Sequence, residues 1–185
     1  MSIPPAMTIR YAIDVQDRLI EVDEHWTTFA RDNDGAAVAP DRVLGRKLWT
    51  AIADLTLRTL YRQMVHLARQ GDPVRFSFRC DSPDERRLFD MEIRQRDGGV
   101  VEFTSTLRER ESRPAVPLLD SHRPRSQELV RMCSWCQRVS AHGRWLPVEA
   151  AVEELGLMHQ PALPGLTHGM CSECYTKAWA VVQDR

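Results

Sequence analysis

Two close pairs of cysteines constrain the fold of this chain more than any other feature of its sequence. The first pair is Cys133-Ser-Trp-Cys136, and the second is Cys171-Ser-Glu-Cys174. A Cys-x-x-Cys turn supplies two thiolates from one tight bend, and Zn²⁺ takes four such ligands at about 2.3 Å in a tetrahedron. The chain between the pairs must fold back on itself to complete the set. The pattern therefore predicts a single Cys₄ zinc site.

Redox-active dithiols and an iron–sulfur cluster are the alternative uses of these four cysteines. The N-terminus has no basic segment followed by an apolar stretch, so we predict no secretion signal and expect the reducing cytoplasm. In that compartment, close cysteine pairs bind metal more often than they form disulfides. The usual cysteine spacings of iron–sulfur clusters are absent, and such a cluster stays the alternative to zinc.

The predicted site is structural rather than catalytic, because four thiolates leave no open position for water. His168 lies three residues before Cys171 and could replace a cysteine as ligand. Its more ordinary role would be to orient the loop or to hydrogen-bond a thiolate from the second layer around the metal. His142, near the first pair, is interpreted as a solvated loop residue.

A proline-containing segment divides the 185-residue chain. Residues 112–126 contain three prolines and break both the helical and the strand period, which predicts a linker. Residues 1–111 carry one cysteine, Cys80, and residues 127–185 carry four. We therefore expect two small domains, and the second has so few residues that a metal would stabilise its thin core.

Alternating apolar positions predict a five-stranded sheet in the first domain. Two strands meet across a turn at Asp17-Arg18, and the last two flank Asp97-Gly98-Gly99, a strong hairpin signal. Each strand has one apolar and one polar face, so we expect an antiparallel sheet that is covered on one side. The expected strands are 11–15, 20–22, 74–80, 89–93 and 101–107.

Helical spacing predicts two helices between the second and third strands. A short helix covers 25–31, and a stronger one begins after Asp54, which can cap it, and ends near Gly71. In the second domain we expect a strand at 143–146, a helix at 148–155 between Pro147 and Gly156, and a final helix at 172–182. The positive end of the final helix would favour the thiolates of the second pair.

The order of two strands, a helical block and three strands over residues 8–110 resembles the PAS fold. Val43-Leu44-Gly45-Arg46 followed by Leu48-Trp49 is similar to the step that often opens the helical block of PAS domains. The stretch Phe78-Arg79-Cys80-Asp81-Ser82-Pro83 resembles one in a bacterial group of this layout. The resemblance implies an α+β fold with helices on one side of the sheet, and a role in sensing or protein–protein signalling rather than one chemistry.

A second resemblance covers residues 130–176. It rests on the first cysteine pair within Met132–Val139, on Gly143-Arg144-Trp145, and on Thr167-His168-Gly169-Met170 before the second pair. These residues resemble, in the same order, a short C-terminal module of bacterial response regulators and PAS-containing signalling proteins. The resemblance implies metal binding in a signalling protein, in a module similar to a treble clef or zinc ribbon.

Other candidate residues in the first domain have ordinary interpretations beside the functional ones. His66, on the longer helix, could be a haem ligand, but its position near the edge of the polar face favours a partly exposed helix residue. Cys80 continues the apolar face of its strand, which favours a buried hydrophobe over a redox or flavin-adduct role. Five acidic residues lack a partner histidine or nucleophile and are interpreted as solvated surface. They are Asp14, Asp23, Glu24, Asp32 and Asp34.

The sequence thus predicts a non-enzymatic bacterial sensory or signalling adaptor, because no nucleophile–base pair is visible. Its PAS-like domain would bind a small ligand or a protein partner, and a mostly filled interior and a bare sheet predict a homodimer. The alternatives are a haem or redox sensor and a zinc-dependent DNA-binding regulator. For the latter, a modest basic patch could meet phosphates, although the net charge of −1 gives no general attraction to nucleic acid or membrane. The patch comprises Arg113, Arg123, Arg125, Arg131 and Arg138.

Overall fold

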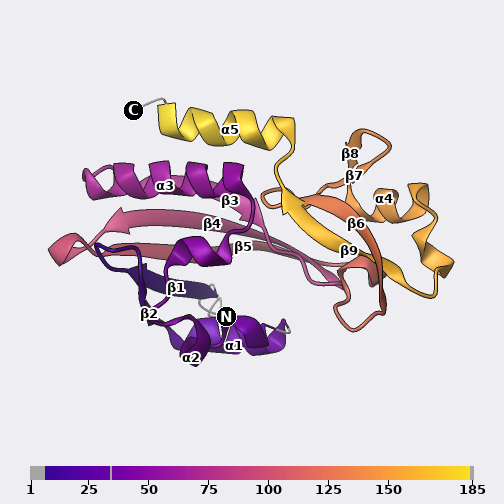
Figure 1. The fold of residues 1–185 in the computed structure, drawn as a ribbon, viewed down its shortest axis with the longest axis horizontal. Helices are drawn as coiled ribbons and strands as arrows, with labels where there is room; N and C mark the ends of the chain where they lie inside the picture. The colour runs from indigo at the N-terminus through magenta and orange to yellow at the C-terminus, as the bar shows by residue number, and fades with distance from the viewer. Residues whose placement is uncertain (1–6, 34, 184–185) are drawn as a thin grey trace, which may run out of the picture. The chain divides into compact units, whose positions relative to one another are not determined.

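The computed structural model describes residues 7–33 and 35–183 and has a mixed α+β fold (Figure 1). The chain divides into two compact units. The first comprises the described parts of residues 1–77, 89–108 and 178–185, and the second comprises residues 78–88 and 109–177. No described helix is long and apolar enough to cross a membrane.

The first unit contains the predicted five-stranded antiparallel sheet, in the order β2-β1-β5-β4-β3. The predicted hairpin across Asp17 is present, with Tyr11 opposite Val22, and β1 also pairs with β5, with Tyr11 opposite Phe103. Strands β3, β4 and the end of β5 continue into the second unit. The strands are β1 (Thr8–Ile13), β2 (Leu19–Val22), β3 (Val74–Arg79), β4 (Glu85–Gln95) and β5 (Val101–Ser112).

The helices of the first unit begin and end at the residues that can cap them. The Asp54 side chain accepts a hydrogen bond from the Leu57 N–H at 2.8 Å at the start of α3 (Leu55–Arg69). At its other end Gly71 has a φ of 97°, and the Gly71 N–H donates to Ala68 O at 3.1 Å, as in a Schellman ending. The other helices of this block are α1 (Glu24–Asp32) and α2 (Pro40–Val43), with short 3₁₀ turns at η1 (Ala36–Val38) and η2 (Leu48–Ala51).

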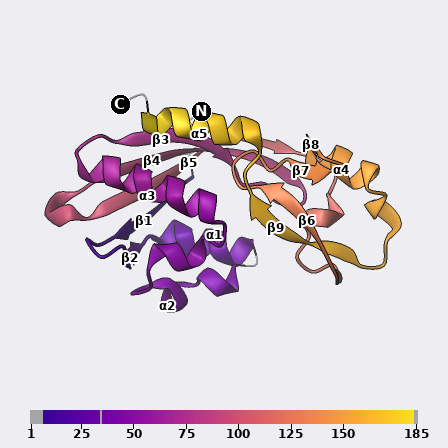
Figure 2. The same ribbon diagram turned by 45° about the horizontal axis from the view of Figure 1, so that its top comes forward.

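One face of the sheet forms the core of the first unit. Aromatic rings from both helices reach it: Phe29 of α1 meets Phe89 edge-on at 6.0 Å, and Tyr61 of α3 meets Phe76 in the same way at 6.0 Å. Helices α1 and α3 therefore cover the same face (Figure 2). The opposite face is polar, and its charged side chains pair across neighbouring strands. The pairs include Arg75–Glu92, Arg94–Glu102, Arg96–Glu102 and Arg108–Asp90.

The second unit is built on a four-stranded sheet in the order β8-β7-β6-β9. Strands β6 and β9 run parallel, and β7 pairs antiparallel with both β6 and β8. The strands are β6 (Arg125–Cys133), β7 (Val139–Ala141), β8 (Arg144–Leu146) and β9 (Leu163–Gly169). As predicted, a helix follows Pro147, namely α4 (Val148–Glu154), and a final helix begins within the second cysteine pair, namely α5 (Ser172–Gln183), whose end belongs to the first unit.

The core of the second unit includes part of the segment that was predicted as a linker. Val116 and Leu118 are buried against Met132 of β6 and Leu163 of β9. The prolines do interrupt the regular period of residues 112–126, but Pro117 opens a 3₁₀ turn, η4 (Pro117–Leu119), that contains the buried Leu118. Strand β5 extends to Ser112 and β6 begins at Arg125, so both edges of the segment are strand residues.

Candidate metal centre

The parallel pairing of β6 with β9 brings the two cysteine pairs together. Cys133 is the last residue of β6 and lies opposite Gly169, the last residue of β9. The Ser134 N–H donates to Gly169 O at 2.9 Å and extends this pairing into the first Cys-x-x-Cys turn. Because parallel strands end at the same edge of a sheet, both turns leave the sheet side by side.

The four cysteine sulfurs form a compact cluster. The Sγ atoms of Cys133, Cys136, Cys171 and Cys174 all lie within 4.8 Å of one another, and the Cys136 and Cys171 sulfurs are 3.8 Å apart. A tetrahedron of thiolates at about 2.3 Å from a central ion has edges of about 3.8 Å. Cys136 is half-buried and the other three cysteines are buried. The cluster can therefore hold a metal ion, as the sequence predicts.

Backbone N–H groups point at the sulfurs of this cluster. The Cys171 N–H donates to Cys133 Sγ at 3.4 Å, and the Cys174 N–H donates to Cys171 Sγ at 3.4 Å. The second of these donors lies in the first turn of α5, where N–H groups have no partner within the helix. Hydrogen bonds of this kind stabilise the charged form of a thiol. They are an electrostatic reason for a metal-binding role of the cluster.

Three cysteines of this cluster shift one another's pKa values in opposite directions. Hydrogen bonds from Cys136 and Cys174 lower the pKa of Cys133. The hydrogen bond to Cys133 in turn raises the pKa of Cys136 to about 12, and the same partner raises the pKa of Cys174. Four negative sulfurs at this spacing would repel one another strongly. A bound divalent cation removes that repulsion, and its binding would release protons.

The first Cys-x-x-Cys turn requires an unusual backbone at its exit. Gln137 has a φ of 57°, in the left-handed region that side-chain-bearing residues rarely adopt. Its N–H donates to Cys133 O at 2.9 Å, and the Cys133 N–H donates to Arg138 O at 2.8 Å. Arg138 also pairs with Glu173 of the second turn at 2.8 Å. Both turns are thus held by backbone and side-chain contacts in addition to the sulfurs.

The structure does not bring the predicted histidines into this cluster. His168 is exposed on β9, and His142 is exposed in the turn between β7 and β8. His66 is exposed on α3, whose buried residues include Leu60 and Met64. The His66 side chain therefore does not line the interior where a haem would bind.

The remaining candidate residues that the structure describes lie at strand ends, turns and helix ends, outside the cysteine cluster. Cys80 is half-buried just after β3, and burial raises the pKa of its thiol. Asp23 caps α1 by accepting from the Trp26 N–H at 2.8 Å, and Asp14 accepts from the Gln16 N–H at 2.8 Å in the hairpin turn. Glu24 opens α1 and Asp32 is its last residue. Asp34 lies outside the described residues.

Three arginines of the predicted basic patch are engaged within the chain. The Arg113 side chain is only 4% exposed and is ion-paired with Glu149 at 2.7 Å. Arg125 donates to the carbonyl oxygen of Asp120 at 2.7 Å, and Arg138 is the partner of Glu173. A guanidinium that is buried or already paired is a poor phosphate ligand. Two of the five arginines of the patch are therefore already paired with carboxylates within the chain.

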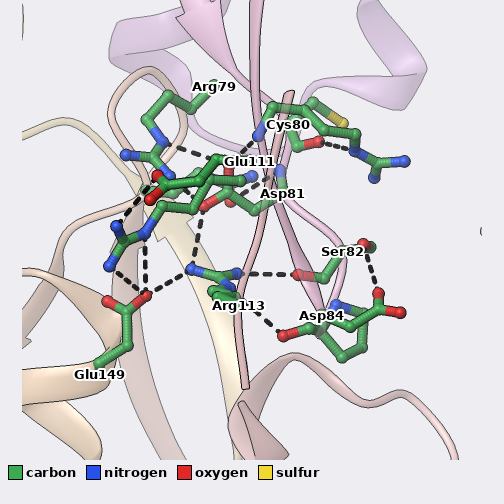
Figure 3. A network of polar contacts seen from close by, with 12 residues as sticks. Arg79, Cys80, Asp81, Ser82, Asp84, Glu111, Arg113 and Glu149 are labelled. Carbon is green, nitrogen blue, oxygen red and sulfur yellow. Dashed lines mark hydrogen bonds and ion pairs between the residues drawn. The ribbon is translucent and has the colours of Figure 1, made fainter. Parts of the chain in front are cut away.

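The sequence did not predict a buried ionic network in the second unit (Figure 3). The Asp81 side chain is 1% exposed and accepts from Arg79 Nη2 at 2.6 Å. Arg113 Nη1 lies 3.3 Å from Asp81 Oδ2, and its other nitrogens donate to the carbonyl oxygens of Ser82 and Pro83. Arg86 joins the network by pairing with Glu149 at 2.9 Å. The only sequence signal was the Arg-Cys-Asp-Ser-Pro stretch, which carried no predicted role.

No protein-family model matches this chain, and no curated protein sequence matches it either. The interpretation of the site therefore depends on its own residues and geometry.

Proposed function

We propose that this chain is a non-enzymatic sensory or signalling adaptor in which a PAS-like domain is joined to a structural zinc module. The observation that carries the proposal is the group of four cysteine sulfurs within 4.8 Å of one another. Four soft ligands in a small tetrahedral set are the donors that structural Zn²⁺ takes. A cluster of several irons separates its thiolates across an inorganic core, so the compact spacing favours a single ion.

A closed set of thiolates supports a structural role. A catalytic zinc needs an open position for water, and it commonly has histidine among its ligands. Among residues 7–33 and 35–183, the four cysteines are the only group of three or more metal-ligating side chains. Bound zinc would supply cross-links between the ends of β6 and β9 and the start of α5. Cys133, Cys136, Cys171 and Cys174 would hold it.

The topology of the first unit supports the PAS-like part of the proposal. The five-stranded antiparallel sheet, with the helical block between β2 and β3, is the arrangement that the resemblance to PAS domains implies. Aromatic side chains lie on its inner face, where Tyr11 stacks on Phe103 with ring centres 4.5 Å apart. An interior filled in this way would favour signalling through protein contact over binding of a bulky cofactor. The second copy of a homodimer, or a protein partner in the cytoplasm, would be that contact.

Elemental analysis of protein purified without added metal tests the proposal. We expect about one zinc per chain, no iron, and an absorption spectrum without haem, flavin or iron–sulfur bands. Cys136→Ser should lose the zinc, because three thiolates leave the ion open to water and chelators. Cys80→Ser is the matched control and should keep it, since Cys80 lies outside the cluster. Stoichiometric zinc in Cys136→Ser, or iron in the wild type, would contradict the assignment.

A further inference from the structure

The turn between the first two cysteines is hydrogen-bonded to the connection between β3 and β4. The Arg79 N–H donates to Trp135 O at 2.7 Å, and the Asp81 N–H donates to the Gln137 side-chain oxygen at 3.0 Å. Trp135 lies between the two cysteines and Gln137 directly follows the second. All four residues belong to the second unit. The residues that position the metal ligands are therefore the ones that hold the start of this connection.

Asp81 distributes this contact through the rest of the connection. Its carboxylate accepts from the Arg87 N–H at 2.9 Å, at the start of β4, as well as from Arg79. The Arg87 side chain returns to the carbonyl oxygen of Cys80 at 2.6 Å. Residues 79–87 are thus closed into one ring of hydrogen bonds around a buried carboxylate (Figure 3). A shift of the Asp81 backbone would therefore disturb hydrogen bonds at the end of β3 and near the start of β4.

The conformation of the cysteine turn depends on its ligands being held together. Gln137 has the left-handed backbone described above, and such a backbone persists only where its surroundings impose it. Without a bound cation no coordination bonds join the two cysteine pairs, so the metal-free turn loses its strongest restraint. The Gln137 side chain would then no longer be aimed at the Asp81 N–H.

We infer that metal occupancy at the four cysteines controls the order of residues 79–87, with Gln137 as the positioning residue that transmits it. This inference rests on the proposed zinc site. Strands β3 and β4 continue from this connection into the five-stranded sheet, so metal loss would affect the ends of two of its strands. The metal-bound cysteine turns would then stabilise the connection between β3 and β4.

Hydrogen exchange on the full-length protein tests this coupling. In zinc-loaded wild type the amides of Arg79 and Asp81 should be protected. Gln137→Ala should speed exchange at Asp81 by about tenfold, the loss expected for one hydrogen bond, while zinc content stays at the wild-type level. Gln127→Ala is the matched control, because Gln127 is exposed on β6 of the same unit. It should leave both the exchange and the zinc unchanged.

Removing zinc from the wild type with a chelator should expose residues 79–87 while the amides of β1 stay protected. If zinc binds but exchange of residues 79–87 is the same with and without it, the coupling is wrong and the zinc site stands. Unchanged exchange at Asp81 in zinc-loaded Gln137→Ala would also overturn the coupling, even where chelation unfolds the whole chain. If the wild type binds no zinc, the proposed function itself fails, and the inference fails with it.

Discussion

The two units of this protein use different means to hold a small sheet together. In the first, helices α1 and α3 bring aromatic and long aliphatic side chains onto one face of five strands. In the second, the buried cluster is aliphatic and includes Ala141 and Ala151. Of the largest fully buried side chains that the structure describes, only Leu118, Leu163 and Val139 belong to the second unit.

On the proposed function, this difference explains why the cysteines lie in the second unit. A smaller unit with smaller core side chains buries less apolar surface to offset the entropy of ordering its chain. Cross-linking by a metal would compensate for that deficit. The first unit has no comparable need, and its one cysteine, Cys80, is outside the cluster. We therefore expect the two units to respond differently to metal removal and to mutation of a core residue.

Metal removal should give the largest difference between the units. Apparent zinc-binding free energies of small zinc modules are about 10–16 kcal/mol, as large as the whole stability of many domains. In the full-length protein, a zinc chelator should therefore remove the hydrogen-exchange protection of β7 and α4 and leave that of β1 and β5. Adding zinc back should restore it. Equal loss of protection in both units would mean that they fold as one, and the comparison would not hold.

A cavity in the aromatic core should destabilise the first unit and leave the candidate metal site of the second unit intact. Phe89 is 1% exposed, and its ring packs edge-on against Phe29. Phe89→Ala should lower the unfolding free energy of the first unit by about 3–5 kcal/mol, since both the buried ring and the packing around it are lost. Denaturant unfolding, followed by exchange at β1 and β5, measures the effect.

The zinc content of Phe89→Ala should stay at the wild-type level, because the residue does not belong to the second unit, which contains the four cysteines. Leu55→Ala is the control on α3, where Leu55 is 71% exposed, and it should change stability by less than about 0.5 kcal/mol. Loss of zinc from Phe89→Ala would show that the metal site depends on the first core.

The ionic network of the second unit should give the smallest effect, which is present near neutral pH and lost in acid. Burial acts to raise the pKa of Glu149, but its own backbone N–H and the guanidinium groups of Arg113 and Arg86 together lower it below its ordinary value of 4.5. A lowered pKa in the folded state means that the carboxylate stabilises the fold above pH 4.5, and that this contribution is lost as the pH falls through the folded value.

Glu149→Gln should therefore be less stable than wild type near neutral pH, and the difference should shrink below pH 4.5. Because the side chain is 34% exposed, solvent screening should keep the difference below about 1 kcal/mol. Paired unfolding curves of the two proteins measure it, and loss of zinc in acid affects both alike. A difference that grows as the pH falls would contradict the sign of the pKa shift.

Local patterns predicted most of the elements correctly. Asp54 and Gly71 bound α3, and Pro147 and Gly156 bound the helix α4 and its exit, because caps and turns depend on residues close in sequence. The alternation of apolar residues predicted the five strands and their buried face for the same reason. The four clustered cysteines were also predicted, since each pair already presents two ligands on one turn.

Such local patterns did not predict contacts between segments that lie far apart in the sequence. Strand β6 was missed because its exposed and half-buried residues from Arg125 to Arg131 show no clean alternation, and its start fell within the predicted linker. Val116 and Leu118 were assigned to that linker because the prolines around them break every local period. Asp81 and Glu149 lie 68 positions apart in the sequence, and only Arg113 between them in space makes them one network.

The ligand types, caps and turns of this protein could therefore be predicted from its sequence, while the pairing of distant segments could not. Ligand type, cap and turn chemistry and the faces of strands follow from side chains within a few residues of one another. The parallel pairing of β6 with β9, which closes the cysteine set, places Cys133 opposite Gly169, 36 residues further along the chain. The bond from Asp81 to Gln137 joins residues 56 apart. Such contacts form only where the packed chain brings them together, because loop closure and burial, rather than local preference, decide which distant segments meet.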